Sequence, residues 1–478
     1  MKTAETDTAE AVRRVLILGG GFAGVYTALS LERELRPADR IEVTLVNREN
    51  YFLFTPFVCE VAASAIDPTH AVNPIRRLLR RTRFVEGEIT GLDTERRSVS
   101  VRQPDGGERA YSYEHLVIAL GAGTAFFGMQ DVQQHALTAT TLCDAIHLRN
   151  WAIELLEIAA VEPDPAARTE LLTFVVVGGG FTGVEMAGAL NALLRQALRA
   201  YRNIAACDVR VILVEALPRL LPQFNERLAR SALGALRSCG VEVRLNTRIA
   251  GARDHAVLTK DGEWLPTRTL VWASGVAPHP FAARFGVPTD DQGWVTVDAH
   301  LRVPDLPNVW ALGDCAHIPD PQRPGHFQPA LAQHAMREAR HLARNLAAVL
   351  RGAPTTPFRY RTQGQMATLA HYNGVGVIGP ISVSGILAWI AWRSYYLWRL
   401  PRLGKRLHVA MDWTADILFG RDISQLQTYR TTSTVTHQAP EASTSMAATT
   451  IPPPSQTGAP SIEEGRRQVS AEKPRHDG

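Results

Sequence analysis

The sequence predicts an α/β fold built from two similar strand–turn–helix units, with a separate helical segment near the C-terminus. Three observations lead to this prediction. Apolar β-forming residues run into a glycine-rich turn at Val15–Tyr26, VLILGGGFAGVY, and the arrangement returns at Val175–Glu185, VVVGGGFTGVE. A helical pattern follows each turn, over Val25–Leu35 and Val184–Leu198. Residues 380–430 differ from both units because they are rich in aromatic and basic side chains.

Length and composition are those of a globular protein. The 478 residues suffice for about three domains of roughly 150 residues each. With 45% hydrophobic and 21% charged residues and a net charge of +4, the chain does not favour nucleic acid as a partner. The five cysteines are widely spaced and form no Cys-x-x-Cys, so we expect neither a disulfide framework nor a metal site. Residues 1–12 lack the apolar core of a secretory signal and are expected to be a disordered lead.

Both glycine-rich turns have the spacing Gly-x-Gly-x-x-Gly. The first glycine permits a tight turn, the second lets the backbone approach a pyrophosphate, and the third lets the helix pack closely on the strand. The helix N-terminus then points free N–H groups at the phosphates. One copy is as typical of an ordinary turn as of a nucleotide site, but two copies in the same context predict two Rossmann-like dinucleotide-binding domains. The glycines are Gly19, Gly21 and Gly24 in the first turn and Gly178, Gly180 and Gly183 in the second.

The residue that ends the next strand distinguishes the two units. Strand Ile41–Val46 ends at Asn47, whereas strand Val209–Val214 leads to Glu215. A carboxylate at this place binds the ribose hydroxyls of an adenosine and repels a 2′-phosphate, so the second unit should prefer NADH over NADPH. Asn47 can still accept one hydrogen bond from a ribose.

Two further strands run into glycines. The strand HLVIAL leads to Gly121, which lets the backbone touch a cofactor or simply ends the strand. The β-rich run Trp294–Leu312 leads to Gly313 and Asp314. The Asp314 carboxylate suits a cofactor hydroxyl, and its alternative role is to cap a nearby helix. A long helical pattern follows over Pro329–Leu350.

Two regions are rich in arginine. Ala71–Arg83 reads as the edge of a helix, and we expect its arginines to form a solvated face. In residues 380–430, Arg393 interrupts the apolar run, so no uncharged stretch is long enough to span a bilayer. Pro401 and Gly404 are expected to break this segment into two helices.

The C-terminal segment combines aromatic rings, which favour the level of lipid headgroups, with basic groups, which are drawn to anionic lipid. It is therefore predicted to lie on a membrane surface. A buried helical hairpin or a dimer interface is the alternative use of the same patch, so a homodimer stays open. The side chains concerned are Trp389, Trp392, Tyr395, Tyr396, Trp398, Arg393, Arg399, Arg402, Lys405 and Arg406.

Several stretches taken together resemble a known family. They are VTLVNRENYFLFTPFVCEVAA, HLVIALGAGTAFFG, VVVGGGFTGVEMAGAL, VWASGV, ALGDCA and QMATLA, followed by the aromatic and basic segment. As a set they resemble the type II, non-proton-pumping NADH:quinone oxidoreductases, within the flavoproteins that have two dinucleotide-binding domains and are related to the pyridine nucleotide-disulfide oxidoreductases. The resemblance covers about Arg13–Gln427.

This resemblance implies FAD in the first glycine turn and NADH in the second. The three glycines of the first turn would hold the FAD pyrophosphate, and Asn47 would bind its ribose. Gly121 would let the backbone approach the cofactor, and Asp314 would bind its ribityl chain. The glycines of the second turn and Glu215 would hold NADH. The implied domains are FAD-binding over 13–170 and 279–379, NADH-binding over 171–278, membrane-surface helices over 380–430 and a disordered tail over 431–478.

The resemblance also implies a site for a quinone. Glu185 matches an acid near the nicotinamide and quinone sites, although a first-turn acid is also favoured by the helix dipole alone. Gln333 begins an Ala-Gln-x-x-x-Gln quinone motif whose second glutamine is Arg337 here, and Gln363 stands where related sequences often carry lysine or leucine. These departures affect the contact with the quinone head group.

The implied reaction passes hydride from NADH to FAD and two electrons on to a membrane quinone without proton pumping, with protons from water or Glu185. The implied partners are NADH, quinone and a membrane surface, and the implied location is peripheral, at the cytoplasmic face of the cell membrane. One alternative is a sulfide:quinone oxidoreductase, which would need Cys143 and Cys315 to meet. Another is a different NADH-dependent flavoprotein reductase, of which a disulfide reductase would need a partner for Cys59. A redox sensor that docks a protein through its C-terminal segment is a third.

Overall fold

The computed structural model describes residues 12–425. Apart from Val12, the expected disordered lead over 1–12 lies outside the described residues. The expected tail over 431–478 and the last residues of the 380–430 segment lie outside them as well.

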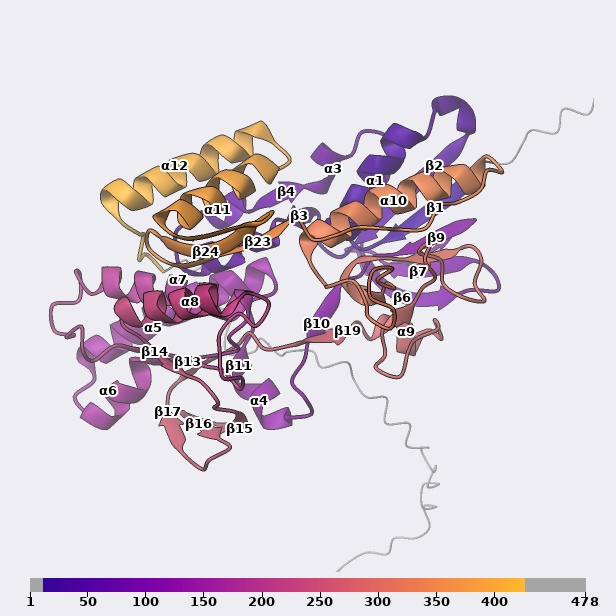
Figure 1. The fold of residues 1–478 in the computed structure, drawn as a ribbon. Coiled ribbons are helices and arrows are strands. Elements are labelled where there is room, and N and C mark those ends of the chain that lie inside the picture. The colour runs from indigo at the N-terminus through magenta and orange to yellow at the C-terminus, as the bar shows by residue number, and fades with distance from the viewer. Residues whose placement is uncertain (1–11, 426–478) are drawn as a thin grey trace, which may run out of the picture. The chain divides into compact units, whose positions relative to one another are not determined.

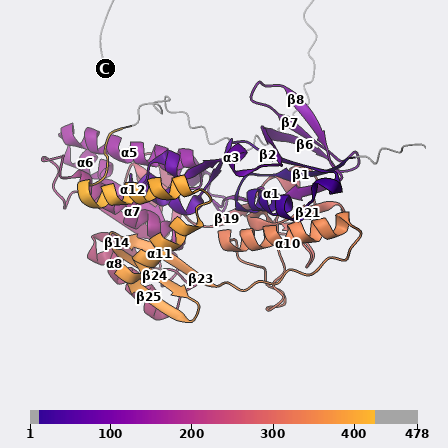
Figure 2. The ribbon, with the colours of Figure 1, turned by 90° about the horizontal axis from the view of Figure 1, so that it is seen from above.

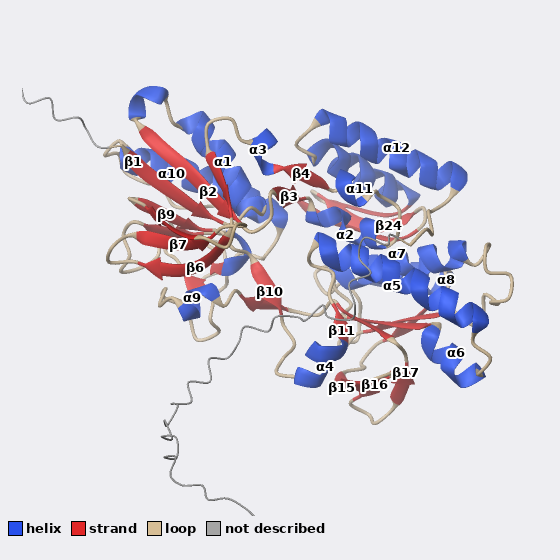
Figure 3. Ribbon diagram, turned by 180° about the vertical axis from the view of Figure 1, so that it is seen from behind, coloured by secondary structure: helices blue, strands red, loops and turns tan. Residues whose placement is uncertain are grey.

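The first glycine-rich turn belongs to a five-stranded parallel sheet with strand order β21-β9-β1-β2-β5. Figures 1 and 3 label its strands β1, β2 and β9. In β1, Leu18 lies opposite Val46 of β2 and Ile118 of β9, so these three strands end at the same edge. Helices α1 (Phe22–Glu34) and α10 (Ala332–Leu350) pack against each other beside the sheet. The strands are β1 (Arg13–Leu18), β2 (Ile41–Asn47), β5 (Arg83–Glu86), β9 (His115–Ile118) and β21 (Val309–Ala311).

Smaller elements complete the first unit. An antiparallel sheet is formed by β6 (Glu88–Asp93), β7 (Ser98–Arg102) and β8 (Glu108–Ser112). Paired strands are β3 (Tyr51–Leu53) with β4 (Val72–Pro74), and β20 (Val295–Thr296) with β22 (Ala316–His317). Short helices are η1 (Pro37–Asp39), η2 (Thr55–Phe57), α2 (Val58–Ala62), η3 (Pro68–His70), α3 (Ile75–Leu78), α9 (Phe281–Arg284) and η4 (Gly313–Cys315).

The second glycine-rich turn belongs to another five-stranded parallel sheet, with strand order β11-β18-β12-β13-β14. Its strands are β11 (Ala136–Leu137), β12 (Thr173–Val177), β13 (Arg210–Val214), β14 (Val241–Arg244) and β18 (Thr269–Trp272). The helices of this part are α4 (Gln130–His135), α5 (Leu142–Val161), α6 (Pro165–Leu171), α7 (Phe181–Ala197) and α8 (Glu226–Ser238). Strands β15 (Ile249–Arg253), β16 (Ala256–Thr259) and β17 (Trp264–Pro266) form a small sheet, and β10 (Ala122–Thr124) pairs with β19 (Val276–Pro278).

The second sheet includes a strand that precedes Leu171, the residue at which we expected the second unit to begin. Strand β11 pairs with β18, although it precedes α5 in the sequence. This strand has only two residues, which is too short for an apolar pattern to reveal. The expected boundary between 13–170 and 171–278 therefore assigns β11 to the first unit, whereas in the structure β11 belongs to the second sheet.

The C-terminal part is a three-stranded antiparallel sheet followed by two helices, of which the first covers the sheet. Strands β23 (Gly364–Ala370), β24 (Asn373–Ile378) and β25 (Ile381–Gly385) form the sheet. Helix α11 (Ile386–Arg399) packs on it and α12 (Leu403–Phe419) follows beside α11 (Figure 2). The break at Pro401 is as expected. The break expected at Gly404 is wrong, because this residue lies in the first turn of α12, where glycine is readily accommodated.

Two other expectations need correction. Helices α1 and α7 begin at Phe22 and Phe181, one turn earlier than predicted, because each starts directly after the second glycine of its turn. Ala71–Arg83 is not a helix edge. Only Ile75–Leu78 is helical there, because β4 ends at Pro74 and leaves room for a single turn.

Candidate functional site: two glycine turns and a half-buried acid

The first glycine-rich turn has the steric features that a bound pyrophosphate requires. Gly19 has φ +105°, and a Cβ there would lie 2.3 Å from the Ala119 carbonyl oxygen. A Cβ on Gly24 would lie 1.9 Å from the Gly19 carbonyl oxygen, so only glycine lets α1 pack this closely. A Cβ on Gly21, in contrast, would meet no atom of the described residues within 4 Å. The second glycine of the turn thus presents bare backbone to open space.

The second turn repeats this geometry. Gly178 has φ +114°, and its Cβ would lie 2.6 Å from the Ala273 carbonyl oxygen. A Cβ on Gly183 would lie 1.7 Å from the Gly178 carbonyl oxygen. Around Gly180 the described part of the chain again leaves a 4 Å space free. Helix α7 begins immediately after Gly180 without a side-chain cap, so its first N–H groups are available to an anion.

Asn47 and Glu215 occupy equivalent places and support their glycine turns. The Gly20 N–H donates to Asn47 Oδ1 at 2.7 Å, and Asn47 Nδ2 donates to the Glu49 carbonyl at 2.8 Å. The Gly179 N–H donates to Glu215 Oε2, and the Leu217 N–H donates to Glu215 Oε1 at 2.7 Å. Each of the two carboxylate oxygens of Glu215 can accept a further bond, whereas Asn47 has a single oxygen, with one lone pair left, and carries no charge.

Asp314 lies at the edge of the first sheet, after β21. It makes no hydrogen bond or ion pair with any residue of the described range 12–425, and burial raises the pKa of its carboxyl. The neighbouring Gly313 N–H donates to Glu338 Oε2 at 2.8 Å. Glu338 is buried in α10, and burial raises its pKa to about 8. Gly121, with φ +72°, has open space where a side chain would be, as at Gly21.

Glu185 lies in the second turn of α7, where three parts of the chain meet. Its Oε1 accepts hydrogen bonds from the Thr368 backbone N–H of β23 and from Trp392 Nε1 of α11, both at 3.1 Å. Burial raises the pKa of Glu185 to about 8, the two hydrogen bonds oppose this, and the nearby charge of Glu60 adds to it. At neutral pH the carboxyl group therefore holds a proton.

The remaining predicted quinone residues lie at the start of α10. Both ends of the Gln333 amide are engaged, since Nε2 donates to the Gly364 carbonyl at 2.9 Å and Oε1 accepts from the Tyr360 hydroxyl at 3.2 Å. The Arg337 guanidinium lies over the Tyr360 ring, 5.4 Å from its centroid. Gly364 begins β23 and Thr368 lies four residues further on. Gln333 and Glu185 therefore contact one strand at points roughly 13 Å apart.

Two of the predicted membrane-level aromatic residues are buried instead. Trp392 donates to Glu185, and Trp389 packs on Arg393, whose guanidinium lies 4.2 Å from the ring centroid. Arg393 is buried as well and forms an ion pair with Glu60 at 3.5 Å. For these residues the alternative of a buried helical hairpin is correct, because α11 has to cover β23, β24 and α2.

Other side chains of α11 and α12 are strongly exposed. Trp398 is 67% exposed and Phe419 86% exposed, which is unusual for large apolar groups. The full set is Ile386, Leu387, Ile390, Tyr395, Trp398, Leu403, Leu407, Met411, Ile417, Leu418 and Phe419. Across residues 12–425, no helix has the length and apolarity needed to cross a membrane.

Sequence reasoning missed the partners that shape the site. Thr368 contributes only a backbone N–H, and Trp392 resembled the other aromatic residues of its segment. Glu60 and Glu338 each interrupt an otherwise apolar helical face. Because acids are rarely buried without a partner, this pattern could have predicted that both residues belong to the site. All five cysteines are free, and Cys59 lies against Thr182 while Cys315 lies against Leu312. The described residues form no cluster of metal-binding side chains.

The two parallel sheets with their glycine turns, and the acid Glu185 of α7 bonded to Trp392 of α11, form the framework of an α/β oxidoreductase. Comparison with known proteins bears out this class. The pyridine nucleotide-disulphide oxidoreductase family matches residues 13–339, and the NDH2 C-terminal domain matches residues 363–422. The chain belongs to the type II NADH:quinone oxidoreductases within this family.

Individual relatives cover nearly the whole chain. A type II NADH:quinone oxidoreductase of Mycobacterium tuberculosis is 32% identical, over 88% of this chain and 92% of its own. A demethylphylloquinone reductase of Synechocystis is 30% identical, over 84% and 95%. The structure of NDH2 from Plasmodium falciparum in complex with NADH has a TM-score of 0.79 at 19% identity, with 87% of this chain and 100% of that chain covered. The predicted fold class and enzyme family are thereby confirmed.

Proposed function

We propose that this chain oxidises NADH and reduces a membrane quinone, with FAD held at the first glycine turn and NADH at the second. The observation that carries the proposal is the pair of turns, each with an open second glycine at the edge of a parallel sheet. Bound FAD would supply the two-electron chemistry that joins the two substrates.

The first turn fits FAD by the chemistry of its free groups. Open backbone at Gly21 and Gly121 suits a pyrophosphate and the flavin chain, and the unpaired Asp314 carboxylate suits a ribityl hydroxyl. Because a partly buried carboxylate without a partner is costly, Asp314 would be stabilised by such a hydroxyl. Asn47 supports the turn through Gly20. We propose that it contributes to the ribose site through this support.

The second turn fits NADH in the same way. Open backbone at Gly180 suits the pyrophosphate, and the spare lone pairs of Glu215 suit the two hydroxyls of a ribose. The same carboxylate would repel a 2′-phosphate. We therefore propose that the enzyme selects NADH over NADPH.

Glu185 is proposed to deliver a proton to the quinone. Its carboxyl is protonated at neutral pH and is held by Thr368 and Trp392 at fixed distances. Gln333 and Arg337 are proposed to position the quinone from the other end of β23, with Gln333 kept in orientation by Gly364 and Tyr360.

The exposed apolar side chains of α11 and α12 support a membrane surface as the source of the quinone. We propose that the enzyme sits peripherally at the cytoplasmic face of the cell membrane. A homodimer through these helices would cover the same side chains and compete with this use.

Steady-state turnover with NADH, NADPH and sulfide as reductants, each against a quinone, tests the proposal. We expect turnover with NADH, much weaker turnover with NADPH and none with sulfide. Turnover with sulfide in place of NADH would overturn the proposal.

A further inference from the structure

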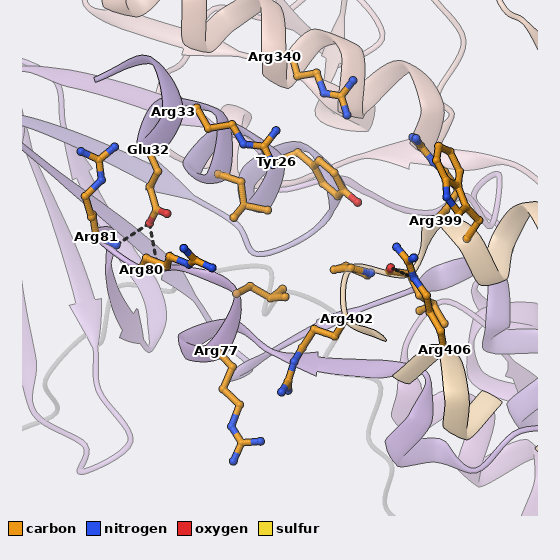
Figure 4. A pocket seen from close by; sticks show the side chains of 15 residues that line it. Tyr26, Glu32, Arg33, Arg77, Arg80, Arg81, Arg340, Arg399, Arg402 and Arg406 are labelled. Atoms are coloured by element: carbon orange, nitrogen blue, oxygen red, sulfur yellow. Dashed lines mark hydrogen bonds between the residues drawn. The ribbon is translucent and has the colours of Figure 1, made fainter. Parts of the chain in front are cut away.

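A hollow of about 980 Å³ lies between α1, the segment from α3 to Arg81, α10 and the junction of α11 with α12 (Figure 4). None of the residues predicted to bind FAD, NADH or quinone lines it. Its lining contains one carboxylate and eight arginines: Arg33, Arg77, Arg80, Arg81, Arg340, Arg399, Arg402 and Arg406. We call this feature the arginine hollow.

The positive charge of the arginine hollow is not neutralised by the protein. None of the eight arginines forms an ion pair with a carboxylate of residues 12–425. The single acid, Glu32, has its Oε1 bonded by the backbone N–H groups of Arg80, Arg81 and Thr82 at 2.8 to 2.9 Å. Glu32 thus fixes the arginine-bearing loop at the rim (Figure 4).

Positive charges also lie close together around Arg340 of α10. Burial lowers the pKa of Arg340, and the nearby charges of Arg337, Arg399 and Arg33 lower it further. Arg399 Nε is buried without a hydrogen-bond partner in the described part of the chain. An anion between these groups would relieve the repulsion and satisfy open donors.

Apolar groups adjoin the arginines. Leu29, Leu78 and Leu400 line the hollow together with Trp398, which is 67% exposed. Leu403 at 69% exposure and Leu407 at 59% continue this exposed apolar surface along α12. A ligand that fits both features has phosphate at one end and hydrocarbon at the other.

We propose that the arginine hollow binds the headgroup of an anionic phospholipid, with its acyl chains on the exposed apolar side chains of α12. Guanidinium groups pair with phosphate oxygens through two parallel hydrogen bonds, so several arginines together suit a phosphate group. Eight arginines are more than a single phosphate group can engage, so a headgroup with two phosphates should bind most tightly. The inference rests on the membrane association proposed above and adds a specific ligand to it.

The test compares two variants of the full-length protein. In Arg33→Gln/Arg77→Gln both changes remove guanidinium groups of the hollow that lie outside α11 and α12. In the control Arg96→Gln/Arg109→Gln the same charge is lost from exposed positions on the β6–β8 sheet. Binding is measured by flotation with vesicles of phosphatidylcholine, with and without cardiolipin. Calorimetry with a soluble short-chain phosphatidylglycerol, and separately with inorganic phosphate, follows binding without a membrane.

We expect the Arg33→Gln/Arg77→Gln variant to bind cardiolipin vesicles roughly tenfold more weakly than the control variant. It should also lose the short-chain lipid, which wild type binds. Equal loss in both variants would show unspecific attraction and overturn the inference, as would tighter binding of inorganic phosphate than of the short-chain lipid. Because neither measurement involves turnover, failure here is distinct from failure of the proposed reaction.

Discussion

The two glycine turns of this molecule share their backbone geometry and differ in charge. In both, the first glycine has a positive φ and the third approaches the carbonyl of the first so closely that a Cβ would lie within 2 Å of it. In both, the N–H between the first two glycines donates to the side chain at the end of the next strand. That side chain is the neutral Asn47 in one turn and the carboxylate Glu215 in the other.

This difference separates two kinds of feature: the glycines, which steric constraints require in both turns, and the residue at the end of the next strand, whose charge can vary. Close packing of helix on strand forces the glycines in both turns. The strand-end residue has only to accept one N–H bond, so its charge is available to select the nucleotide. We interpret the carboxylate as the mark of the NADH turn. We propose that the ligand of the turn with the amide is held by more distant groups, with Asp314 foremost.

The largest effects should come from the third glycines. In Gly183→Ala the new Cβ would collide with the Gly178 carbonyl, and such overpacking costs roughly 1–3 kcal/mol or more. We expect NADH binding to be lost while flavin is retained. Gly24→Ala should instead yield protein without flavin. Absorbance spectra and NADH titration measure both, and loss of the same ligand in both variants would break the distinction between the turns.

The next effect concerns Glu215. Glu215→Gln keeps an acceptor for the Gly179 N–H, gives up the acceptor for the Leu217 N–H and removes the charge that we propose binds the ribose and repels a 2′-phosphate. Hydrogen bonds to a charged group contribute about 2 kcal/mol, so KM for NADH should rise about thirtyfold. KM for NADPH should change less. An unchanged ratio of the two KM values would contradict the assignment.

Glu185 should govern the pH dependence of quinone reduction. Because its pKa lies at about 8, the group is protonated below this pH and loses its proton above it. We expect kcat to fall as the pH rises through about 8. Glu185→Gln should lower kcat about tenfold, less than general acids often contribute, because water also supplies protons. The variant should show a flat profile in this range, and a persisting fall would assign the proton to another group.

The smallest effect is expected at Asn47. Asn47→Ala removes one neutral hydrogen bond to Gly20, which is worth about 1 kcal/mol. The flavin Kd should rise several-fold, well short of the change at Glu215. Equilibrium dialysis of flavin measures this Kd. A loss of affinity as large as that expected for Glu215→Gln would contradict the difference that we draw between the two turns.

The sequence predicted features that repeat a local pattern. Both turns, the strand ends at Asn47 and Glu215 and the break at Pro401 follow from neighbouring residues. Contacts between distant segments could not be predicted in this way. Trp392 donates to Glu185, some two hundred residues away, and three arginines of Ala71–Arg83, namely Arg77, Arg80 and Arg81, line a hollow that the end of α11 and the start of α12 help to form. Burial and charge environment follow from tertiary packing, which no local pattern records.

The central claim is that two different nucleotides act in sequence through these turns. Anaerobic rapid mixing of the protein with NADH, followed by mixing with a quinone, tests it most directly. The account predicts that NADH bleaches the flavin absorbance band and that the quinone restores it, with both steps fast enough for turnover. A flavin band that NADH leaves unchanged, or a bleached band that the quinone fails to restore, would contradict it.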